Sequence, residues 1–444
     1  MKISFLTGVV TLCVVGTALA QNTPSPAFSN FSDPTTPPPP AVDTVAPASQ
    51  TPPTPYATAT PTYEGPGAAH AEKKKPFTVF ATIREVYDDN IFTTHDNKTD
   101  QFETVIEPSI LFNYPMDQTL FQARYTFGAT YYPDRAGSSF DLSHDFLGRI
   151  NHSFSDRFNI DARDRVLNTD QPQVSNGATV NRVAGSYTNN TFTLQGTAQW
   201  MPKFNTVTTY TNDYFAYDDP TQSVFNDRDV NTLQHDFDYL LTPVLTLVAG
   251  GIFNDVSYDN KFTPVAGGTD VSRDWTSYTG YVGANYNLTP ELQVSGRLGA
   301  VESEYDRGGS DLEPYGEATI NWQIGARSSL AFDYTHTATQ TDINFYSAAI
   351  SDSFSLTGRY QFTPKISGRI QGSYSQNTDL ANAGVTNDLG DYHEDVLGID
   401  VGVGYDLTRY LNLNLAYTFA DITSDNDALS YTRNQISLGL TATY

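Results

Sequence analysis

The last ten residues of the chain alternate strictly between apolar and small polar side chains. A β-strand turns successive side chains to opposite faces, so this segment predicts a strand with one apolar and one polar face. Its apolar face consists of Ile436, Leu438, Leu440, Ala442 and Tyr444. A strand that ends on an aromatic residue in this way is typical of bacterial outer-membrane barrels, in which one face meets lipid and aromatic girdles lie at the membrane boundaries.

The other end of the chain predicts export. Met1 and Lys2 form a short charged start, residues 5–15 are an apolar run too short to cross a bilayer comfortably, and Ala18-Leu19-Ala20 resembles a cleavage site. We therefore expect a signal peptide over residues 1–20. Cys13, the only cysteine, lies inside it, so the mature chain would have no disulfide. Export alone leaves a soluble periplasmic or secreted protein open as the alternative to membrane insertion.

Residues 21–75 form a separate region rich in Pro, Ala and Thr. Such a composition has too few apolar side chains to form a packed core, so we expect a disordered periplasmic linker. A flexible tether is the simplest interpretation. Contact with the cell wall or with a periplasmic partner is the alternative.

Charge and motifs exclude several classes of function. The chain has 50 acidic and 25 basic residues and a formal net charge of −25, which argues against a nucleic-acid partner. None of its seven histidines forms a metal-ligand pair at helical spacing. We expect no metal, no cofactor and no enzymatic activity, although a Ser–His site assembled from facing strands would leave no local motif.

From residue 76 onward, short turns alternate with longer polar loops. The turns include three near copies, Leu241-Thr242-Pro243, Leu288-Thr289-Pro290 and Phe362-Thr363-Pro364. Five further short turns are expected at 114–115, 155–157, 201–202, 325–327 and 407–409. Loops rich in Asp, Asn and Gly are expected at about 89–100, 132–139, 169–185, 218–227, 259–272, 305–311, 340–348, 377–393 and 422–430. Eight turns and nine loops separate 18 strands, which predicts an all-β transmembrane antiparallel barrel over 76–444 with both termini periplasmic. The count becomes 16 if one long loop has been divided wrongly.

Aromatic residues stand near both ends of the predicted strands. Near the short turns these are Phe112, Trp200, Tyr286, Trp322, Tyr360 and Tyr405; near the long loops they are Tyr131, Tyr217, Tyr258 and Tyr305. A soluble β-sandwich also alternates between apolar and polar positions. Long strands with aromatics at both ends favour the membrane barrel, and these residues are the candidate girdles.

Charged residues fall on the polar face of the strands. Alternation places seven arginines there, each a few residues from a short turn: Arg124, Arg149, Arg163, Arg165, Arg297, Arg359 and Arg369. In a barrel they would line the periplasmic half of the lumen, where charged side chains sort solutes by sign. Asp145, Asp161, Asp236, Asp238, Asp333 and Asp400 share the same face. The arginines either attract anions or pair with these carboxylates and rigidify the wall, and the sequence favours neither interpretation.

The first hairpin resembles the family called putative β-barrel porin 2. The resemblance is carried by Val86-Tyr87-Asp88-Asp89-Asn90-Ile91-Phe92 and by Ile106-Glu107-Pro108-Ser109-Ile110. A partial copy of the first segment occurs at 256–262. The resemblance implies an outer-membrane barrel over about 77–444 and brings no site residues with it. Since some members look tied to export of surface polysaccharide, it also implies such a role as one alternative.

Two functions follow as hypotheses. The first is a porin-like passive diffusion channel for small hydrophilic solutes, because barrels of 16–18 strands leave an aqueous channel unless a loop such as 169–185 or 377–393 folds inward. The alternative is an accessory or scaffold barrel for polysaccharide export or envelope attachment. Expected partners are outer-membrane lipid and lipopolysaccharide, the barrel assembly machinery through the strand ending at Tyr444, and peptidoglycan or polysaccharide.

Overall fold

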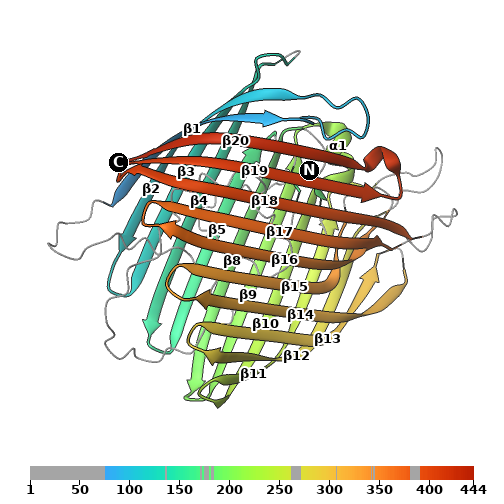
Figure 1. Ribbon diagram of the computed structural model, residues 1–444. Coiled ribbons are helices and arrows are strands. Elements are labelled where there is room, and N and C mark those ends of the chain that lie inside the picture. Colours follow the sequence, from blue (N-terminus) through green and yellow to red (C-terminus); the bar gives the residue numbers. More distant parts are fainter. Residues whose placement is uncertain are drawn as a thin grey trace, which may run out of the picture.

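The computed structural model describes residues 76–444, apart from 136–137, 171–172, 175–179, 182–184, 262–271, 307, 342, 344–345 and 381–390. The signal peptide and the linker predicted for 1–75 lie outside the described residues. In the described part, eighteen strands form one closed antiparallel sheet, a barrel whose strands are tilted around a common axis (Figure 1). The first and last strands, β1 and β20, pair from Phe80–Thr443 to Asp88–Gln435 and close the wall.

Each barrel strand pairs with the next strand in the chain. The barrel strands are β1 (Phe77–Asp88), β2 (Gln101–Pro115), β3 (Thr119–Tyr131), β4 (Phe140–Ser155), β5 (Phe158–Thr169), β8 (Tyr187–Met201), β9 (Phe204–Tyr217), β10 (Arg228–Thr242), β11 (Leu245–Tyr258), β12 (Trp275–Thr289), β13 (Leu292–Tyr305), β14 (Ser310–Ile324), β15 (Ser328–Gln340), β16 (Ala348–Thr363), β17 (Ile366–Asp379), β18 (Tyr392–Thr408), β19 (Leu411–Ser424) and β20 (Tyr431–Thr443).

Four short elements lie in the long loops. The strands β6 (Gln173–Val174) and β7 (Val180–Asn181) pair only with each other. The 3-10 helix η2 spans Asp427–Leu429 and the helix α1 spans Pro220–Asn226. Asp219 caps α1 by accepting hydrogen bonds from the hydroxyl and the backbone N–H of Thr221, and these bonds lower the pKa of the Asp219 carboxyl. No helix in the described part of the chain is long and apolar enough to cross a bilayer.

All eight predicted short turns and all nine predicted long loops are present, so the strand count of 18 is confirmed and the alternative of 16 is wrong. The near-identical turns share one mechanism. Thr242, Thr289 and Thr363 each accept a hydrogen bond through the side-chain hydroxyl from the backbone N–H two residues further on. Proline follows each threonine, where its fixed φ favours the turn.

The outer face of the barrel carries the apolar side chains. Large hydrophobic residues such as Ile83, Val282, Leu298 and Ile370 are exposed there, while alternate residues on the same strands point inward. A soluble sandwich would bury this face, whereas the acyl chains of a bilayer cover it in a membrane barrel. The predicted girdle at the short-turn end is confirmed for Trp200, Tyr286, Trp322, Tyr360 and Tyr405, which are all exposed.

The girdle predicted at the long-loop end was partly wrong. Tyr217 and Tyr258 are buried and point inward, because each occupies a strand position of the other parity. A different set of tyrosines lies on the outer face, and each hydroxyl forms a hydrogen bond with a polar side chain nearer the loops. These bonds are Tyr125 to His144, Tyr210 to Asn231, Tyr334 to Asp352, Tyr374 to Asp395 and Tyr417 to Asn434. An aromatic ring with a polar tip suits the boundary between hydrocarbon and water.

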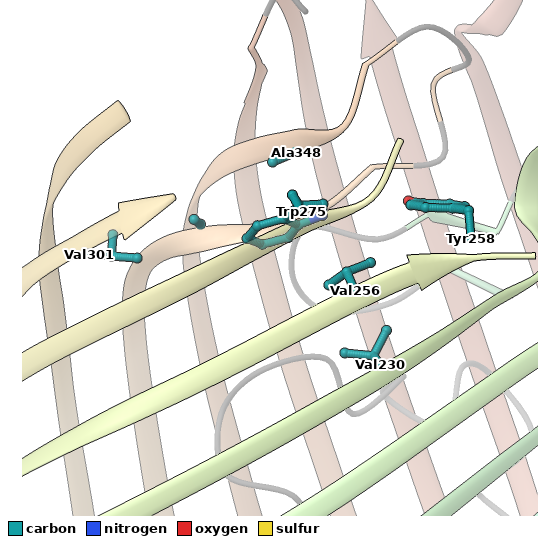
Figure 2. Packing of buried hydrophobic residues seen from close by; sticks show 7 residues of the cluster. Val230, Val256, Tyr258, Trp275, Val301 and Ala348 are labelled. Atoms are coloured by element: carbon teal, nitrogen blue, oxygen red, sulfur yellow. The ribbon is translucent and has the colours of Figure 1, made fainter. Parts of the chain in front are cut away.

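The β15–β16 hairpin folds into the barrel at its long-loop end. β15 pairs with β14 only from Gly316–His336 to Ile324–Ser328, so its outer residues leave the wall. Ala338 and Ala348 then pack with Val230, Val256, Tyr258, Trp275 and Val301 on the inner surface of β10–β13 (Figure 2). These seven buried apolar and aromatic residues exclude water locally, which gives the barrel a small apolar core at one side of its mouth.

Candidate functional site: the barrel lumen

The inner face of β3–β5 carries a ladder of alternating charges. The Asp145 carboxylate on β4 forms ion pairs with Arg165 at 3.0 Å and with Arg124 at 3.6 Å. Asp161 on β5 accepts from Arg163 at 2.7 Å and also from the Arg149 guanidinium. The four arginines predicted on these strands are therefore held by two carboxylates. Because four arginines share two carboxylates, the group carries a net positive charge on this side of the lumen.

A second group of charges is buried on β10–β14. Arg297 donates to Glu317 at 2.8 Å, and its side chain is 1% exposed. Asp236 accepts from the Tyr281 hydroxyl at 2.5 Å and from Gln234 at 3.0 Å. Buried ions need both a partner and further hydrogen bonds, and this network supplies them. Arg297 is thus a structural residue of the wall, and burial separates its guanidinium from the lumen.

Glycines make room for this network. A Cβ at Gly250 would lie 2.7 Å from the Tyr281 hydroxyl oxygen and 2.6 Å from Asp236 Oδ1. A Cβ at Gly283 would lie 2.9 Å from the Arg297 Cγ atom. The missing side chains let Tyr281 and Arg297 lie close against the inner wall. Larger residues at either glycine would displace them toward the lumen.

The remaining two predicted arginines oppose each other on β16 and β17. Arg369 reaches Asp400 at 3.3 Å and donates to Gln371 at 2.9 Å. Arg359 is exposed and has no hydrogen bond or ion pair within the described ranges of the chain. Six of the seven predicted arginines are consequently paired with carboxylates, and Arg359 differs from them.

Opposite charges also face each other across the barrel. In a closed order of 18 strands, strands nine positions apart lie on opposite sides. This places β4, which carries Arg149, on the wall opposite β15, which carries the exposed Asp333. Such an arrangement produces a field across the lumen, to which a charged solute would respond.

The inward hairpin is anchored by an arginine that the sequence analysis did not single out. Arg273, just before β12, is buried and donates to the backbone carbonyls of Phe225 at 2.6 Å, Thr341 at 2.7 Å and Tyr346 at 2.8 Å. These bonds join the loop before β10 to the tip of the hairpin. Arg273 lies in a loop and has no strand alternation to indicate its direction, so the sequence offered no signal for it. The loops expected to fold inward, 169–185 and 377–393, lie largely outside the described residues.

No group of three or more His, Cys, Asp or Glu side chains suited to a metal ion occurs among the residues that the structure describes. His144 and His235 lie on the outer face, where they bond Tyr125 and Thr208, while the neighbouring Asp145 and Asp236 point inward.

Residues 76–444 match the model of a known protein family, described as "Putative beta-barrel porin 2". The chain belongs to this family. Family membership and the 18-stranded barrel make it a porin-like protein of the bacterial outer membrane, of a transport type and not an enzyme. Outer-membrane lipid accordingly surrounds its apolar exterior.

Solved structures of similar fold have very different sequences. They include OccK9 (OpdG) of Pseudomonas aeruginosa, 11% identical over 83% of this chain and 98% of that chain, with a TM-score of 0.46. The FrpB iron transporter of Neisseria meningitidis (F5-1 variant) is 8% identical over 83% and 82%, with a TM-score of 0.46. OccAB3 of Acinetobacter baumannii is 13% identical over 83% and 99%, with a TM-score of 0.42. No curated protein sequence matches the chain.

In this member of the porin family, the motif that carried the resemblance joins the first strand to the last. Asp88 is fully buried and accepts from Arg433 on β20 at 2.5 Å. Asp89 accepts from the Asn434 backbone N–H at 2.6 Å and from its side chain at 2.7 Å. The Asn90 side chain donates to the Thr432 carbonyl at 3.0 Å. We define Asp88, Asp89, Asn90, Arg433 and Asn434 as the seam clasp.

Proposed function

We propose that the protein is a passive diffusion channel for small hydrophilic solutes. The observation that carries the proposal is the closed 18-stranded wall with ionised side chains on its inner face, because barrels of this strand number are wide enough for an aqueous channel. The opposed charges of Arg149 and Asp333 favour polar, charged or dipolar solutes over apolar ones. The β15–β16 hairpin narrows the mouth on one side.

Conductance tests the proposal. The full mature chain, refolded in detergent and added to a planar bilayer, should give discrete ohmic current steps. Liposomes that contain it should swell in isotonic solutions of small sugars. A folded barrel that gives neither current nor swelling would contradict the channel.

The inward hairpin is the specific observation that favours a second candidate function. A barrel whose mouth is partly filled could serve as an anchor or accessory for surface polysaccharide export or for envelope attachment. In that case the folded protein would be silent in the bilayer and would bind purified polysaccharide or peptidoglycan in a pull-down. The linker over 21–75 is the segment that we propose to contact the cell wall.

Processing and assembly belong to the same proposal. We propose that residues 1–20 are removed on export, which mass spectrometry of the membrane-inserted chain would show as a mature start at Gln21. We also propose that the assembly machinery recognises the strand ending at Tyr444, the most exposed large aromatic of the described outer surface at 82%. Lipopolysaccharide is the proposed lipid partner at the long-loop end.

A further inference from the structure

Two pairs of arginines lie directly opposite each other on the inner face of the barrel. Arg149 on β4 opposes Arg163 on β5, and Arg359 on β16 opposes Arg369 on β17. Side chains in such positions start about 5 Å apart, and like charges there repel. Each pair therefore favours a negative group between its guanidiniums.

The first pair holds a carboxylate of the protein itself. Asp161, two residues before Arg163 toward the short turn, accepts from Arg163 Nε at 2.7 Å and from Arg149 Nε at 3.1 Å. Asn151, directly opposite Asp161, donates to it at 3.2 Å. One carboxylate thus bridges both guanidiniums and neutralises most of the repulsion.

The second pair has the same geometry without the bridging carboxylate. The positions equivalent to Asn151 and Asp161 are occupied by Gln361 and Ser367, which also oppose each other. Asp400 approaches from β18, where it pairs with Arg369 at 3.3 Å and accepts from the Thr418 hydroxyl at 3.4 Å. Arg359 stays exposed to the lumen and has no partner within the described ranges.

The surroundings of the second pair leave Arg359 exposed, while Arg369 is half-buried beside it. The residue opposite Arg359 on β15 is Ser329, and the residue opposite Arg369 on β18 is Gly402. Neither carries a charge or reaches as far as a guanidinium. A solute that passes this level of the lumen therefore meets the exposed guanidinium of Arg359. The guanidinium of Arg369 lies beside it, with Asp400 on the β18 side.

We infer that Arg359 and Arg369 bind the carboxylate group of a permeating solute, in the place that Asp161 takes between Arg149 and Arg163. The inference rests on the proposed channel function and specifies its solute class as small organic carboxylates. A planar guanidinium matches a carboxylate in two parallel hydrogen bonds, which a halide cannot form. The exposure of Arg359 to the lumen keeps the bound solute exchangeable, as conduction requires.

Block of chloride current by succinate tests the site. In the refolded full chain, added succinate should reduce the chloride current in a saturable manner. Arg359→Gln removes the exposed fork and should raise the half-blocking concentration about tenfold, the effect of losing one charge-assisted hydrogen-bonded contact. Arg359→Lys, which keeps the charge but not the fork, should give an intermediate value.

Reciprocal variants test the comparison between the two pairs. Ser367→Asp gives the second pair the bridging carboxylate of the first and should raise the half-blocking concentration at least as much as Arg359→Gln. Asp161→Ser removes the carboxylate from the first pair and should create a second blocking site, seen as stronger block at low succinate. Heat-shifted gel mobility confirms that each variant is folded before it is measured.

Asn285→Asp is the matched control for charge. Asn285 lies on the inner face of β12, four residues before Thr289, as Arg359 lies four residues before Thr363. This variant also adds one negative charge. Its half-blocking concentration should stay within about twofold of the unaltered chain. The inference would be overturned if Asn285→Asp and Ser367→Asp had equal effects on the block. It would also be overturned if the block were unchanged in both Arg359→Gln and Ser367→Asp. In either case the chloride current itself would still support the channel. Absence of any current would contradict the channel instead.

Discussion

At the scale of single residues, the arginines of the inner face are of two kinds: most are paired with carboxylates in the wall, and one is exposed to the lumen. Arg297 is covered and bonded to Glu317, whereas Arg359 is exposed and unpaired within the described part. The two arginines have the same relation to their strands, since both lie on the inner face near a short turn. What differs is the neighbouring strand, which supplies a carboxylate in one case and a serine in the other.

Glu317→Gln tests the structural role of the buried pair. The change leaves Arg297 buried with Asp236 as its nearest carboxylate at 3.9 Å, so the unfolding free energy in detergent should fall by about 3–5 kcal/mol. Urea unfolding followed by tryptophan fluorescence measures it. Glu302→Gln on the exposed outer face is the control and should change stability by less than about 0.5 kcal/mol. Equal effects of the two variants would mean that the buried pair contributes little.

At the scale of elements, the β15–β16 hairpin differs from the other barrel hairpins. Its outer end leaves β14 and becomes an inner layer, held by the apolar contacts of Trp275 and Val256 and by Arg273. Among the described residues, the outer end of β14 then has no strand partner on the β15 side. Pro314 stands in this stretch, where a residue without a backbone donor is tolerated.

Arg273→Ala should loosen the hairpin at the mouth. Four backbone carbonyls lose a charged donor, so the hairpin should pack less tightly and the single-channel conductance and its noise should rise. Planar-bilayer recording measures both. Lys261→Ala, which changes an exposed cation with only a distant ion pair to Asp306 at 4.0 Å, serves as the control. Identical recordings from the two variants would exclude the hairpin as a constriction.

At the scale of the whole molecule, closure depends on two strands that are far apart in the chain. The seam clasp joins residues separated by about 345 positions, and its central pair, Asp88 and Arg433, is buried. Since a barrel tolerates no free strand edge in lipid, the clasp stabilises the β1–β20 pairing that closes the wall. Asp88, Asp89 and Asn90, part of the segment that carries the family resemblance, thus help to close the barrel of this chain.

Asp88→Asn should weaken the closed barrel as a whole. Arg433 would remain buried without its carboxylate, and the temperature at which the folded gel band converts to the unfolded band should drop by several degrees. Samples heated in steps before electrophoresis give this midpoint. Glu304→Gln on the outer face is the control and should keep the midpoint of the unaltered chain. An unchanged midpoint for Asp88→Asn would show that the clasp is not needed for closure.

The sequence by itself determined the turns and the two faces of the wall, and it predicted 18 strands with 16 as the alternative that the structure excluded. These features follow from local chemistry: the period of two along a strand, and the Thr-Pro turns that bond within a few residues. Only the tertiary structure decided which charges meet. Arg149 and Arg359 look alike in the chain, and the pairing register alone places Asp161 beside one and Ser367 beside the other. The inward hairpin and the seam clasp depend in the same way on contacts between distant segments, for which a single strand carries no signal.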